Sequence, residues 1–585
     1  MRFGMSQWIR RAGSFAVLLF ASIAACSSRD NGFEQDGAHF EQDAGGDDSA
    51  PATCGGKRCS RDLHAVIDDC TENVIEQCRD DQGCAAGACV AACDSAAASQ
   101  GSIGCSFFAI PPDTMPLSES SCYTVFIANT WNTPVHVTAE FGNQALDISK
   151  SIYRASSQNG AVTYERIDAI PPRDLGIVFL SQGDRAPTGK NHLDCPAGVE
   201  VAVRQTVVKE HATSIYPAFH LMTDAPVSAY SLFPYGGAKS YLPAATLLLP
   251  TSSWDMNYIL VDGWGMNVAA PFVQIVAQQD DTEVRIRPSV DILDGVNVSG
   301  GIRGAVTTWT LSRGQVLELT QPKSLAGSPI ETSHPVAVFG GTQCSNVPDN
   351  SAACDSLHQQ IPPIHQWSSS YSGVPYESRR VAVGTRPPEQ VYWRVVGAAD
   401  GTVLTYDPAM PIGAPTTLAS GQVVSFVSEF PYKVKSQDTN HPFHLAVYMS
   451  GSTVYQTLGD PDFVDIVPDE QFLDHYVFFL DYTYSDSNLT FVRRKDVNGF
   501  HDVTLDCLGV ITGWQPLGTD GTTEYTWVDM TRGHSPVGNC GYGRHEAQSD
   551  GAFGLYVWGL DQDASYGFPA GAGSRPTSPY QVIVR

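Results

Sequence analysis

A short aromatic signature recurs three times along this chain and restricts its possible folds more than any other feature. It consists of a proline, an aromatic residue four positions later and a tyrosine four positions after that: Pro250, Trp254 and Tyr258; Pro363, Trp367 and Tyr371; Pro468, Phe472 and Tyr476. Successive copies begin 113 and 105 residues apart. A period of this length marks repeated structural modules and argues against one enzyme fold.

A second signature keeps the same interval. Gly314-Gln315-Val316 lies 21 residues before Pro335, and Gly421-Gln422-Val423 lies 21 residues before Pro442. The surrounding segments, such as 391–396, are runs of β-branched and aromatic residues bounded by glycine and aspartate, which are typical of strands and turns. The chain is therefore predicted to be all-β, with each repeat closing on an apolar strand.

The period divides most of the chain into about four tandem β units. We place these units at residues 106–249, 250–362, 363–467 and 468–585, with a repeat of roughly 105–113 residues. Six or seven strands in about a hundred residues suit one packed β-sandwich per unit. The alternative is a radial arrangement, in which the same strands form the blades of a β-propeller.

The aromatic signature itself has two interpretations. Trp and Tyr side chains four residues apart, directly after a proline, most simply fill a module core or a junction between modules. The alternative is that Trp254 or Trp367 stacks on a ligand. Because each module would need the same core-filling side chains, three equivalent copies favour the structural interpretation.

Composition and charge exclude several functional classes. Charged residues make up 17% of the chain, with 53 glycines and 37 prolines, which suits a turn-rich exported protein better than a helical bundle. The net charge is −27. Such a surface repels phosphate backbones, so we expect no nucleic-acid partner.

The first 25 residues are predicted to be a signal peptide. Arg10 and Arg11 precede an apolar run at 15–23, which is too short for a membrane span. The residues that end in Cys26 resemble a bacterial lipobox, which implies cleavage before Cys26 and lipid attachment there. Ser27 then favours the outer membrane. The alternative is an ordinary cleaved signal with an incidental cysteine.

The cysteine count predicts disulfides. Of fifteen cysteines, fourteen remain once Cys26 is set aside, and eight of these lie within 54–105. An even number in an exported chain favours disulfides, and a segment this short needs such staples. Zinc is the alternative for 54–105, although paired CxxC spacing is absent. Proximity in the sequence suggests three further pairs: Cys122 with Cys195, Cys344 with Cys354, and Cys507 with Cys540.

Residues 26–53 are predicted to be a disordered acidic tether, because they are rich in glycine and acids and have little to bury. No nucleophile elbow, P-loop or dinucleotide fingerprint occurs anywhere in the chain. We therefore predict no catalytic residues, no bound metal and no cofactor. Two acidic clusters leave calcium as an alternative to solvated turns: Asp460, Asp462 and Asp465, and Asp561 with Asp563.

Three segments together resemble a known family. They are residues 224–230, 248–258 and 274–286, and the closing 565–571 fits as well. They are similar to the N-terminal domain of the IgG Fc-binding protein of mucus, a domain with many bacterial relatives, over roughly residues 122–572. The resemblance implies an all-β extracellular recognition region. It brings no catalytic residues and no antibody-contact motif that maps onto this chain.

These observations predict a bacterial envelope lipoprotein, lipid-anchored and in the outer membrane, which displays β repeats for binding or adhesion. Its expected ligand is an extracellular glycan, a glycoprotein or an envelope protein. A candidate binding loop contains Tyr235, Gly236, Gly237 and Lys239, because loops on rigid scaffolds often carry recognition; a structural turn is the alternative there. Two other functions stay open: a surface glycan hydrolase, whose paired carboxylates sequence cannot reveal, and a passive architectural lipoprotein.

Overall fold

The computed structural model describes residues 56–585 except 159–160, 185–188, 266 and 382–384. The chain divides into two compact units, Met1–Thr53 and Cys54–Arg585, and the fold below is that of the second. Cys26 and the predicted tether lie outside the described residues. Strands dominate the described part, and its two α-helices are α1 (Ala92–Ala98) and α2 (Ser452–Tyr455). No helix in this part is long and apolar enough to cross a membrane. The predicted all-β class is confirmed.

The cysteine-rich module is held together by disulfides. Its elements are a three-stranded sheet, a hairpin and α1: β1 (Lys57–Cys59), β2 (Ala65–Asp68), β3 (Val74–Gln77), β4 (Gln82–Ala85) and β5 (Ala88–Ala91). Its disulfides join Cys59 to Cys84, Cys78 to Cys89, and Cys93 to Cys105. Its own core is a cluster of three buried residues, two of them these cysteines. The staples therefore replace the core that so short a segment lacks, and they leave these thiols unavailable to zinc.

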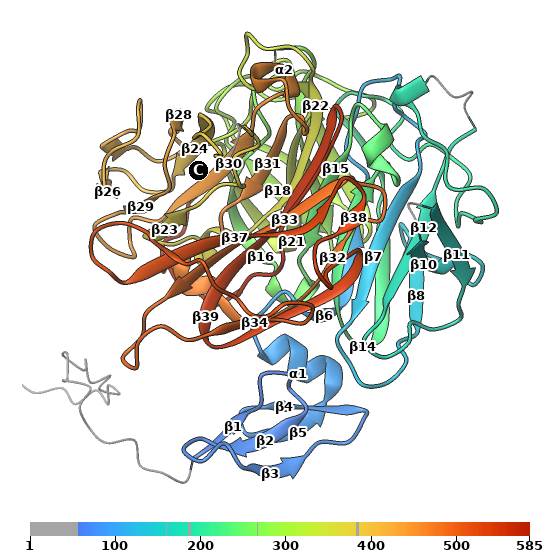
Figure 1. Ribbon diagram of the computed structural model, residues 1–585. Coiled ribbons are helices and arrows are strands. Elements are labelled where there is room, and N and C mark those ends of the chain that lie inside the picture. The colour runs from blue at the N-terminus through green and yellow to red at the C-terminus, as the bar shows by residue number, and fades with distance from the viewer. Residues whose placement is uncertain (1–55, 159–160, 185–188, 266, 382–384) are drawn as a thin grey trace, which may run out of the picture. The chain divides into compact units, whose positions relative to one another are not determined.

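Four larger groups of strands follow along the chain, and one strand that lies before the end of the first group belongs to the second (Figure 1). The first contains β6 (Gly104–Ala109), β7 (Tyr123–Asn129), β8 (Val137–Phe141), β9 (Gln144–Leu146), β10 (Ile152–Gln158), β11 (Ala161–Arg166), β12 (Leu175–Ser181), β14 (Phe219–Phe233) and β15 (Ala244–Leu248). The second contains β13 (Ser214–Pro217), β16 (Asp255–Ile259), β17 (Pro271–Ala277), β18 (Thr282–Ile286), β19 (Thr307–Leu311), β20 (Gln315–Thr320), β21 (Pro329–Ser345) and β22 (Asp355–Ile361).

The third group is divided into smaller sheets: β23 (Ser370–Gly373), β24 (Val391–Gly397), β25 (Thr402–Val403), β26 (Thr405–Asp407), β27 (Thr417–Leu418), β28 (Val423–Ser428), β29 (Tyr432–Lys435), β30 (Phe443–Met449) and β31 (Asp462–Asp465). The fourth contains β32 (Leu473–Leu480), β33 (Asp486–Arg494), β34 (Val503–Leu505), β35 (Gly509–Val510), β36 (Gln515–Pro516), β37 (Thr523–Arg532), β38 (Ser535–Pro536), β39 (Gly543–Asp561) and β40 (Ala564–Pro569). Five short 3₁₀ turns complete the described elements: η1 (Gly189–Asn191), η2 (Gly237–Lys239), η3 (Thr251–Ser253), η4 (Ile364–Gln366) and η5 (Asp469–Gln471).

One long strand organises each group. In the second group, the first part of β21 pairs with β16 and β18, and its later part pairs with β17 and β22. β14 and β39 are shared between two sets of partners in the same way. In the third group, β29 and β30 divide this role. Each group is thus a half-barrel whose two layers enclose apolar side chains, as the sandwich interpretation expects.

The four groups close into a ring. The last strand of each group, namely β15, β22, β31 and β40, pairs with the long strand of its own group. These inner strands also contact one another in succession, and β40 returns to β15. Across the ring, the Gln359 amide nitrogen donates to the carbonyl oxygens of Ala245 (2.9 Å) and Gly567 (3.0 Å). The units are therefore arranged radially, as in the propeller alternative, although each unit has two layers.

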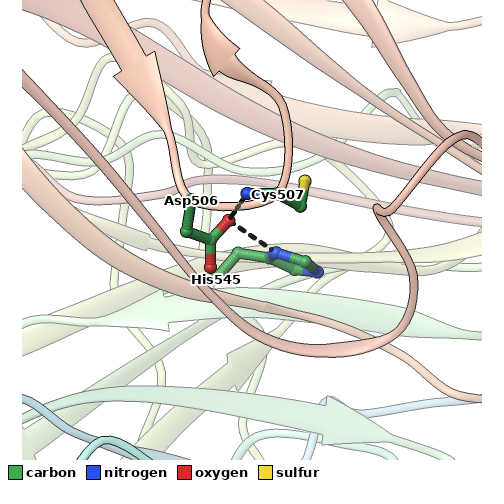
Figure 2. A group of neighbouring side chains, drawn as sticks. All are labelled: Asp506, Cys507 and His545. Atoms are coloured by element: carbon green, nitrogen blue, oxygen red, sulfur yellow. Dashed lines mark hydrogen bonds and ion pairs between the residues drawn. The ribbon is translucent and has the colours of Figure 1, made fainter.

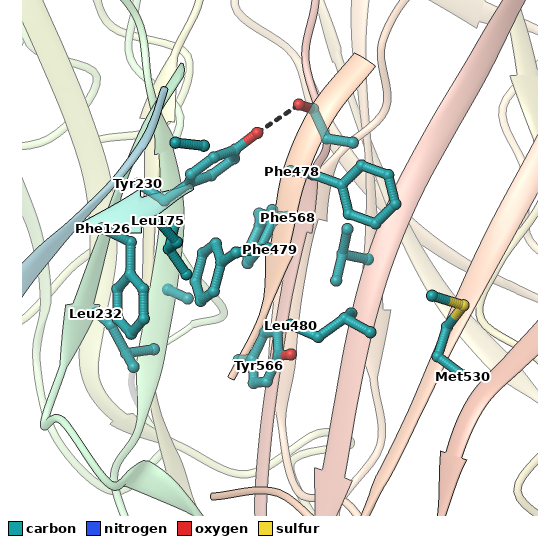
Figure 3. Packing of buried hydrophobic residues seen from close by; sticks show 14 of the residues in the cluster. Phe126, Leu175, Tyr230, Leu232, Phe478, Phe479, Leu480, Met530, Tyr566 and Phe568 are labelled. Atoms are coloured by element: carbon teal, nitrogen blue, oxygen red, sulfur yellow. Dashed lines mark hydrogen bonds between the residues drawn. The ribbon is translucent and has the colours of Figure 1, made fainter. Parts of the chain in front are cut away.

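A continuous hydrophobic core joins the first group to the fourth (Figure 3). The rings of Phe126 and Phe479 stack with centroids 4.1 Å apart. Beside them, the Tyr230 hydroxyl donates to the carbonyl oxygens of Val477 (3.0 Å) and Ala570 (2.6 Å). This closing core brings together residues that are more than two hundred positions apart, and it completes the ring.

The three aromatic signatures form equivalent joints at the ends of the inner strands. Each proline begins a 3₁₀ turn: η3, η4 and η5. In each copy, the tyrosine hydroxyl donates to a backbone carbonyl of the unit's long strand: Tyr258 to Val336 (2.6 Å), Tyr371 to Phe443 (2.5 Å) and Tyr476 to Phe553 (2.5 Å). Val336 and Phe443 directly follow the prolines of the second signature, which explains why the two signatures keep the same interval.

The aromatic residues between these prolines and tyrosines are committed to the fold. The Trp254 indole nitrogen donates to the carbonyl of Leu249, and that of Trp367 donates to Pro362. Trp254, Trp367 and Phe472 are all buried. A ring enclosed in this way cannot stack on a ligand. These three aromatic residues therefore fill the junctions at the ends of the inner strands.

Candidate binding cleft between the third and fourth units

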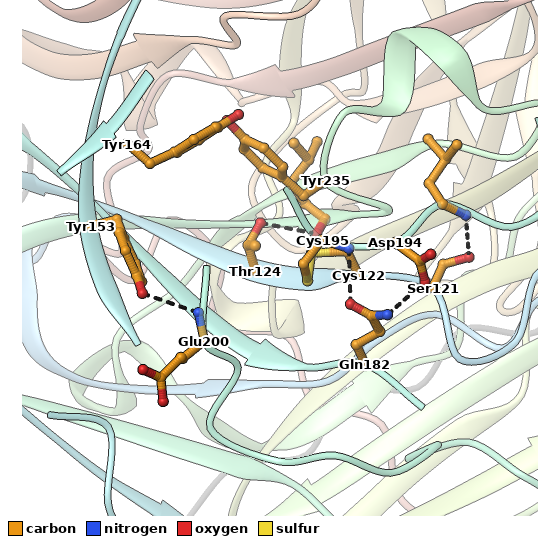
Figure 4. Close-up of a disulfide and its surroundings, with 12 residues drawn as sticks. Ser121, Cys122, Thr124, Tyr153, Tyr164, Gln182, Asp194, Cys195, Glu200 and Tyr235 are labelled. Atoms are coloured by element: carbon orange, nitrogen blue, oxygen red, sulfur yellow. Dashed lines mark hydrogen bonds between the residues drawn. A yellow bond between two sulfur atoms is a disulfide. The ribbon is translucent and has the colours of Figure 1, made fainter. Parts of the chain in front are cut away.

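The candidate loop around Tyr235 is a tight structural turn rather than an open surface (Figure 4). Tyr235 is buried, packs against Phe179 and shares a hydrogen bond of 2.9 Å with the hydroxyl of Tyr164. Gly236 has φ 78°, a left-handed conformation that favours glycine. Lys239 is the exposed side chain of this turn. Tyr235 and Gly237 are therefore enclosed within the turn, while Lys239 is exposed.

The paired cysteines outside the module fix loops in three units. Disulfides join Cys122 to Cys195, Cys344 to Cys354, and Cys507 to Cys540. The first of these lies behind the Tyr235 turn, where the backbone amide of Cys195 donates to the side-chain oxygen of Gln182 (Figure 4). These bonds brace connections between strands and leave the thiols unavailable for chemistry.

Among the described residues, Asp506, Cys507 and His545 form a group of potential metal ligands whose ligand atoms lie within 4.8 Å of one another (Figure 2). Cys507 is bonded to Cys540, so it offers no thiolate. His545 directs one ring nitrogen to Asp506 (3.0 Å) and the other to the carbonyl oxygen of Gly541 (2.8 Å). With both nitrogens engaged and the sulfur in a disulfide, this group is a structural bridge and not a metal site.

A cleft of about 390 Å³ opens where the third unit meets the fourth. Its wall carries five aromatic side chains, from β24, β37 and the loops beside them: Tyr376, Trp393, Phe430, Tyr525 and Trp527. Phe430 is 37% exposed, which makes it the most accessible of the five. Clefts of this size, lined by aromatic faces with a few polar groups, are typical of small-ligand and glycan sites.

The aromatic wall is rigidly positioned. Tyr525 and Trp527 are two residues apart on β37, so both side chains point to the same face of the sheet. Their rings meet edge to face with centroids 5.0 Å apart, and the Trp527 indole nitrogen donates to the carbonyl of Pro375. Trp393, on β24, is fully buried, and its indole nitrogen has no hydrogen-bond partner within the described residues. A ligand that reaches this depth would meet an available donor.

A buried ion pair supports one side of the cleft. Arg379 and Glu389 are 2.5 Å apart, and each side chain is 1% exposed. The Tyr376 hydroxyl also donates to Glu389 (2.6 Å). Burial, and then the charge of Glu389, raise the pKa of Tyr376 well above its usual range, so its hydroxyl stays protonated. The pair fixes a cleft aromatic through charge-assisted hydrogen bonds.

Charged groups at the cleft edge neutralise one another. Burial, and then the nearby charge of Asp529, raise the pKa of Glu377 above its usual range. Arg386 pairs with Glu377 and lies 3.5 Å from Asp529. Arg532 contacts the same two carboxylates, at 3.3 Å and 2.5 Å. Two carboxylates thus lie close together, each bridged by two guanidinium groups.

A second cleft, of about 300 Å³, lies beside the cysteine-rich module and is polar. Glu546 there accepts hydrogen bonds from His475 (2.8 Å) and Arg544 (2.9 Å). The His475 hydrogen bond is the main cause that lowers the pKa of Glu546 to about 2. Because its lining has no Trp, Tyr or Phe, it is a weaker candidate for a glycan site than the aromatic cleft.

Sequence reasoning missed the aromatic cleft because its wall is assembled from segments far apart in the chain. Residues 375–393, 428–431 and 515–527 meet only when the third and fourth units pack together. One local signal was available: Tyr525 and Trp527 stand two apart in a strand-like run, and this spacing puts both rings on one face.

Comparison with known protein families adds one finding. A family model described as IgGFc binding protein matches residues 244–559, more than half of the 585 residues. The match begins at the first residue of β15 and extends into β39, and it includes every residue of the aromatic cleft. No curated protein matches the chain.

Proposed function

The chain belongs to the IgGFc binding protein family, and from this premise we propose that it is an extracellular recognition protein whose aromatic cleft binds a glycan chain carried by a glycoprotein. The observation that carries the proposal is the accessible part of the cleft wall, the exposed ring of Phe430 and the partly exposed ring of Trp527, inside the matched region. A sugar ring presents polarised C–H groups on one face, and these pack favourably on the negative face of an aromatic ring.

The polar groups of the cleft complement this packing. Glu377 and Arg386 lie at its edge and offer acceptors and donors to sugar hydroxyl groups. The family name points to immunoglobulin Fc, which is itself a glycoprotein, as the first ligand to test. We propose glycan recognition as the chemistry because the cleft suits a sugar chain better than a flat protein surface.

Binding is favoured over hydrolysis by the state of the paired carboxylates. A glycoside hydrolase needs one carboxyl group free to donate a proton and a second free to act as base or nucleophile. Glu377 and Asp529 are instead both engaged by Arg386 and Arg532. This arrangement supports the proposal that the chain is not an enzyme.

Phe430→Ala is expected to weaken glycoprotein binding by about tenfold or more, because exposed aromatic anchors at binding sites contribute about 1–2 kcal/mol or more. The measurement is surface plasmon resonance of the purified protein against IgG Fc and a mucin-type glycoprotein, each with and without its glycans. Tyr241→Ala, which removes an aromatic ring of similar exposure (40%) outside the cleft, is the matched control and should leave affinity unchanged.

Two results would contradict this proposal. Equal binding of glycosylated and deglycosylated ligands would mean that a protein surface is recognised instead. Binding that survives Phe430→Ala and a second cleft substitution, Trp527→Phe, would place the site elsewhere. If neither ligand binds under any condition, the architectural role becomes the better explanation.

We also propose that a lipid on Cys26 anchors the protein to the bacterial outer membrane and that residues 26–53 hold the folded part away from it. The support is the sequence pattern alone, a basic start, an apolar run and a small residue before cysteine. Cys26→Ser should move the protein from the membrane fraction to the soluble fraction, measured by fractionation of cells. Retention in the membrane fraction would contradict lipid anchoring.

A further inference from the structure

A concentration of arginines lines the polar cleft of about 300 Å³ beside the cysteine-rich module. Its basic residues come from three parts of the molecule: Arg58, Arg61 and His64 from the module, Arg173 from the first unit, and His475 and Arg544 from the fourth. The lining holds four arginines and three carboxylates, whereas the whole chain has 35 lysines and arginines against 62 aspartates and glutamates. The cleft therefore reverses the charge balance of the chain, which favours a negatively charged ligand.

Direct contacts hold the three parts of this cleft together. The indole nitrogen of Trp131, in the first unit, donates to the carbonyl oxygen of Asp80 in the module (2.8 Å), and the Trp131 ring lies against His64 with centroids 4.1 Å apart. Arg61 of the module pairs with Asp550 of the fourth unit at 2.7 Å. The walls of the cleft are thus positioned by contacts between the parts.

Two of the arginines converge through a shared neighbour, Asn129. Arg544 donates through Nε to the carbonyl oxygen of Asn129 (3.3 Å). The side-chain amide of Asn129 in turn donates to the carbonyl oxygens of Ile170 (3.1 Å) and Pro171 (2.9 Å), and Pro171 begins the turn that carries Arg173. Arg544 therefore lies beside the turn of Arg173, and both residues line the cleft.

Arg173 occupies a backbone position that usually takes glycine or asparagine. Its φ is 56°, in the left-handed region, and a hydrogen bond from the Asp174 amide to the Pro171 carbonyl (3.2 Å) closes the turn. The neighbouring carboxylate of Asp174 pairs with Arg154 (3.4 Å), and Arg173, which is exposed, forms no ion pair with any described residue. A cation is thus held at the cleft without an internal partner.

The carboxylates of the lining are already engaged, so they leave the unpaired arginine without a counter-charge. Glu546 is held by the two hydrogen bonds described above, and Glu72 pairs with Arg58 at 2.5 Å. Asp62 accepts hydrogen bonds within its own loop, from the hydroxyl of Ser60 (2.6 Å) and from the backbone amide two residues later (3.1 Å). An anion that enters the cleft therefore meets an uncompensated positive charge.

His64 supplies an unsatisfied polar atom in the same wall. The residue is 8% exposed, and its Nδ1 lies 2.6 Å from the carbonyl oxygen of Asp62. Its Nε2 is buried and has no hydrogen-bond partner in the described part of the chain. Buried polar atoms are nearly always paired. Because His64 lines the cleft, a polar group of a ligand can supply the missing partner.

The polar side chains of the cleft select the class of ligand. Guanidinium groups form paired, charge-assisted hydrogen bonds with oxyanions. Thr130, Asn132 and Gln548 add neutral donors and acceptors of the kind that bind sugar hydroxyls, and the volume lies at the lower end of the range for small-ligand sites. We propose that the polar cleft binds one anionic sugar, whose carboxylate or sulfate group pairs with Arg173 and Arg544. Because the lining has no aromatic ring, charge and hydrogen bonds hold this sugar, independently of the aromatic cleft.

The test is isothermal titration calorimetry of the purified protein with two pairs of probes, glucuronate against glucose and galactose 6-sulfate against galactose. The members of each pair differ only in the charged group. Binding of a charged sugar without its neutral counterpart is the expected result, and it identifies carboxylate or sulfate as the group that is bound. This binding should weaken as salt rises, because exposed charges are screened. Equal binding of charged and neutral sugars, no binding of either charged sugar, or acetate or inorganic sulfate bound as tightly as the sugars would each overturn the proposal.

Substitution of Arg173 assigns the binding to this cleft. Arg173→Asn should weaken binding of the charged sugar by about tenfold or more, the usual effect of losing a charge-assisted hydrogen bond. Its Tm should stay that of the parent, because asparagine tolerates the left-handed backbone. Arg303→Asn, at an exposed arginine of the second unit outside this cleft, is the matched control and should bind as the parent does. Phe430→Ala should also keep this binding, which separates it from the aromatic cleft. Binding that Arg173→Asn leaves undiminished overturns the proposal.

Discussion

Phe479→Ala is expected to lower the free energy of unfolding by about 3–5 kcal/mol, the usual cost of removing a fully buried phenylalanine. Phe479 is 0% exposed and stacks on Phe126, with centroids 4.1 Å apart, and on Phe568, at 5.2 Å. The lost contacts belong to the core that joins the first unit to the fourth. The measurement is equilibrium unfolding in guanidinium chloride, followed by tryptophan fluorescence.

Phe479→Ala leaves a cavity between the first and fourth units, and this position allows a second measurement. All disulfides outside the cysteine-rich module close loops within one unit, so among the described residues the first and fourth units are held together by non-covalent contacts. Weakening their core should open the ring there and speed proteolytic cleavage between the units. Val497→Ala, at a fully exposed side chain, should change stability by less than about 0.5 kcal/mol. Similar effects of the two substitutions would refute the closing role of Phe479.

Arg379→Met is expected to lower the free energy of unfolding by about 3–5 kcal/mol, because it leaves a buried carboxylate without its counter-charge. Glu389 keeps hydrogen bonds from the Tyr376 hydroxyl and the Arg379 backbone amide but loses the guanidinium group at 2.5 Å. The double variant Arg379→Met with Glu389→Gln removes both charges and should recover part of the loss. Denaturant unfolding of the three variants measures this.

The sign of the pH dependence checks the mechanism. In Arg379→Met, the Glu389 carboxylate stays buried without the guanidinium charge, which makes its charged form costly. Protonation at low pH removes that charge and so relieves the destabilisation. The single variant should therefore lose less stability at pH 4 than at pH 7. A loss that is independent of pH would mean that packing, rather than charge, is responsible.

The repeat unit was predictable from sequence, but its arrangement was not. Pro250, Pro363 and Pro468 mark the period because each begins the same local turn, a property of a few adjacent residues. The ring depends instead on contacts such as Phe126 with Phe479, and no local pattern encodes which distant faces meet. For the same reason, both the sandwich and the propeller interpretations described part of the fold.

The candidate sites show the same difference between features set by neighbouring residues and features set by contacts between distant segments. Disulfide pairing by proximity works for cysteines close in sequence, such as Cys344 and Cys354, because the chain between them is short. The cluster at Asp460, Asp462 and Asp465 suggested solvated turns, yet Asp462 lies in an inner strand and is buried. The aromatic cleft likewise takes Tyr376 from the third unit and Trp527 from the fourth. A site built across units is invisible to any reading of one segment at a time.

The attachment of the cysteine-rich module has a mechanical consequence. Under the proposed anchoring, tension from the membrane enters through this module and reaches β6 through the chain and the disulfide between Cys93 and Cys105, and β6 pairs antiparallel with β14. Pulling β6 along its length loads its hydrogen bonds in shear, so they must break together rather than one at a time. A ligand held in the aromatic cleft pulls on the third and fourth units. Force between the cell and the ligand would thus be transmitted across the ring. The strength of the closing core between the first and fourth units would then set the lifetime of the bond between cell and ligand under load.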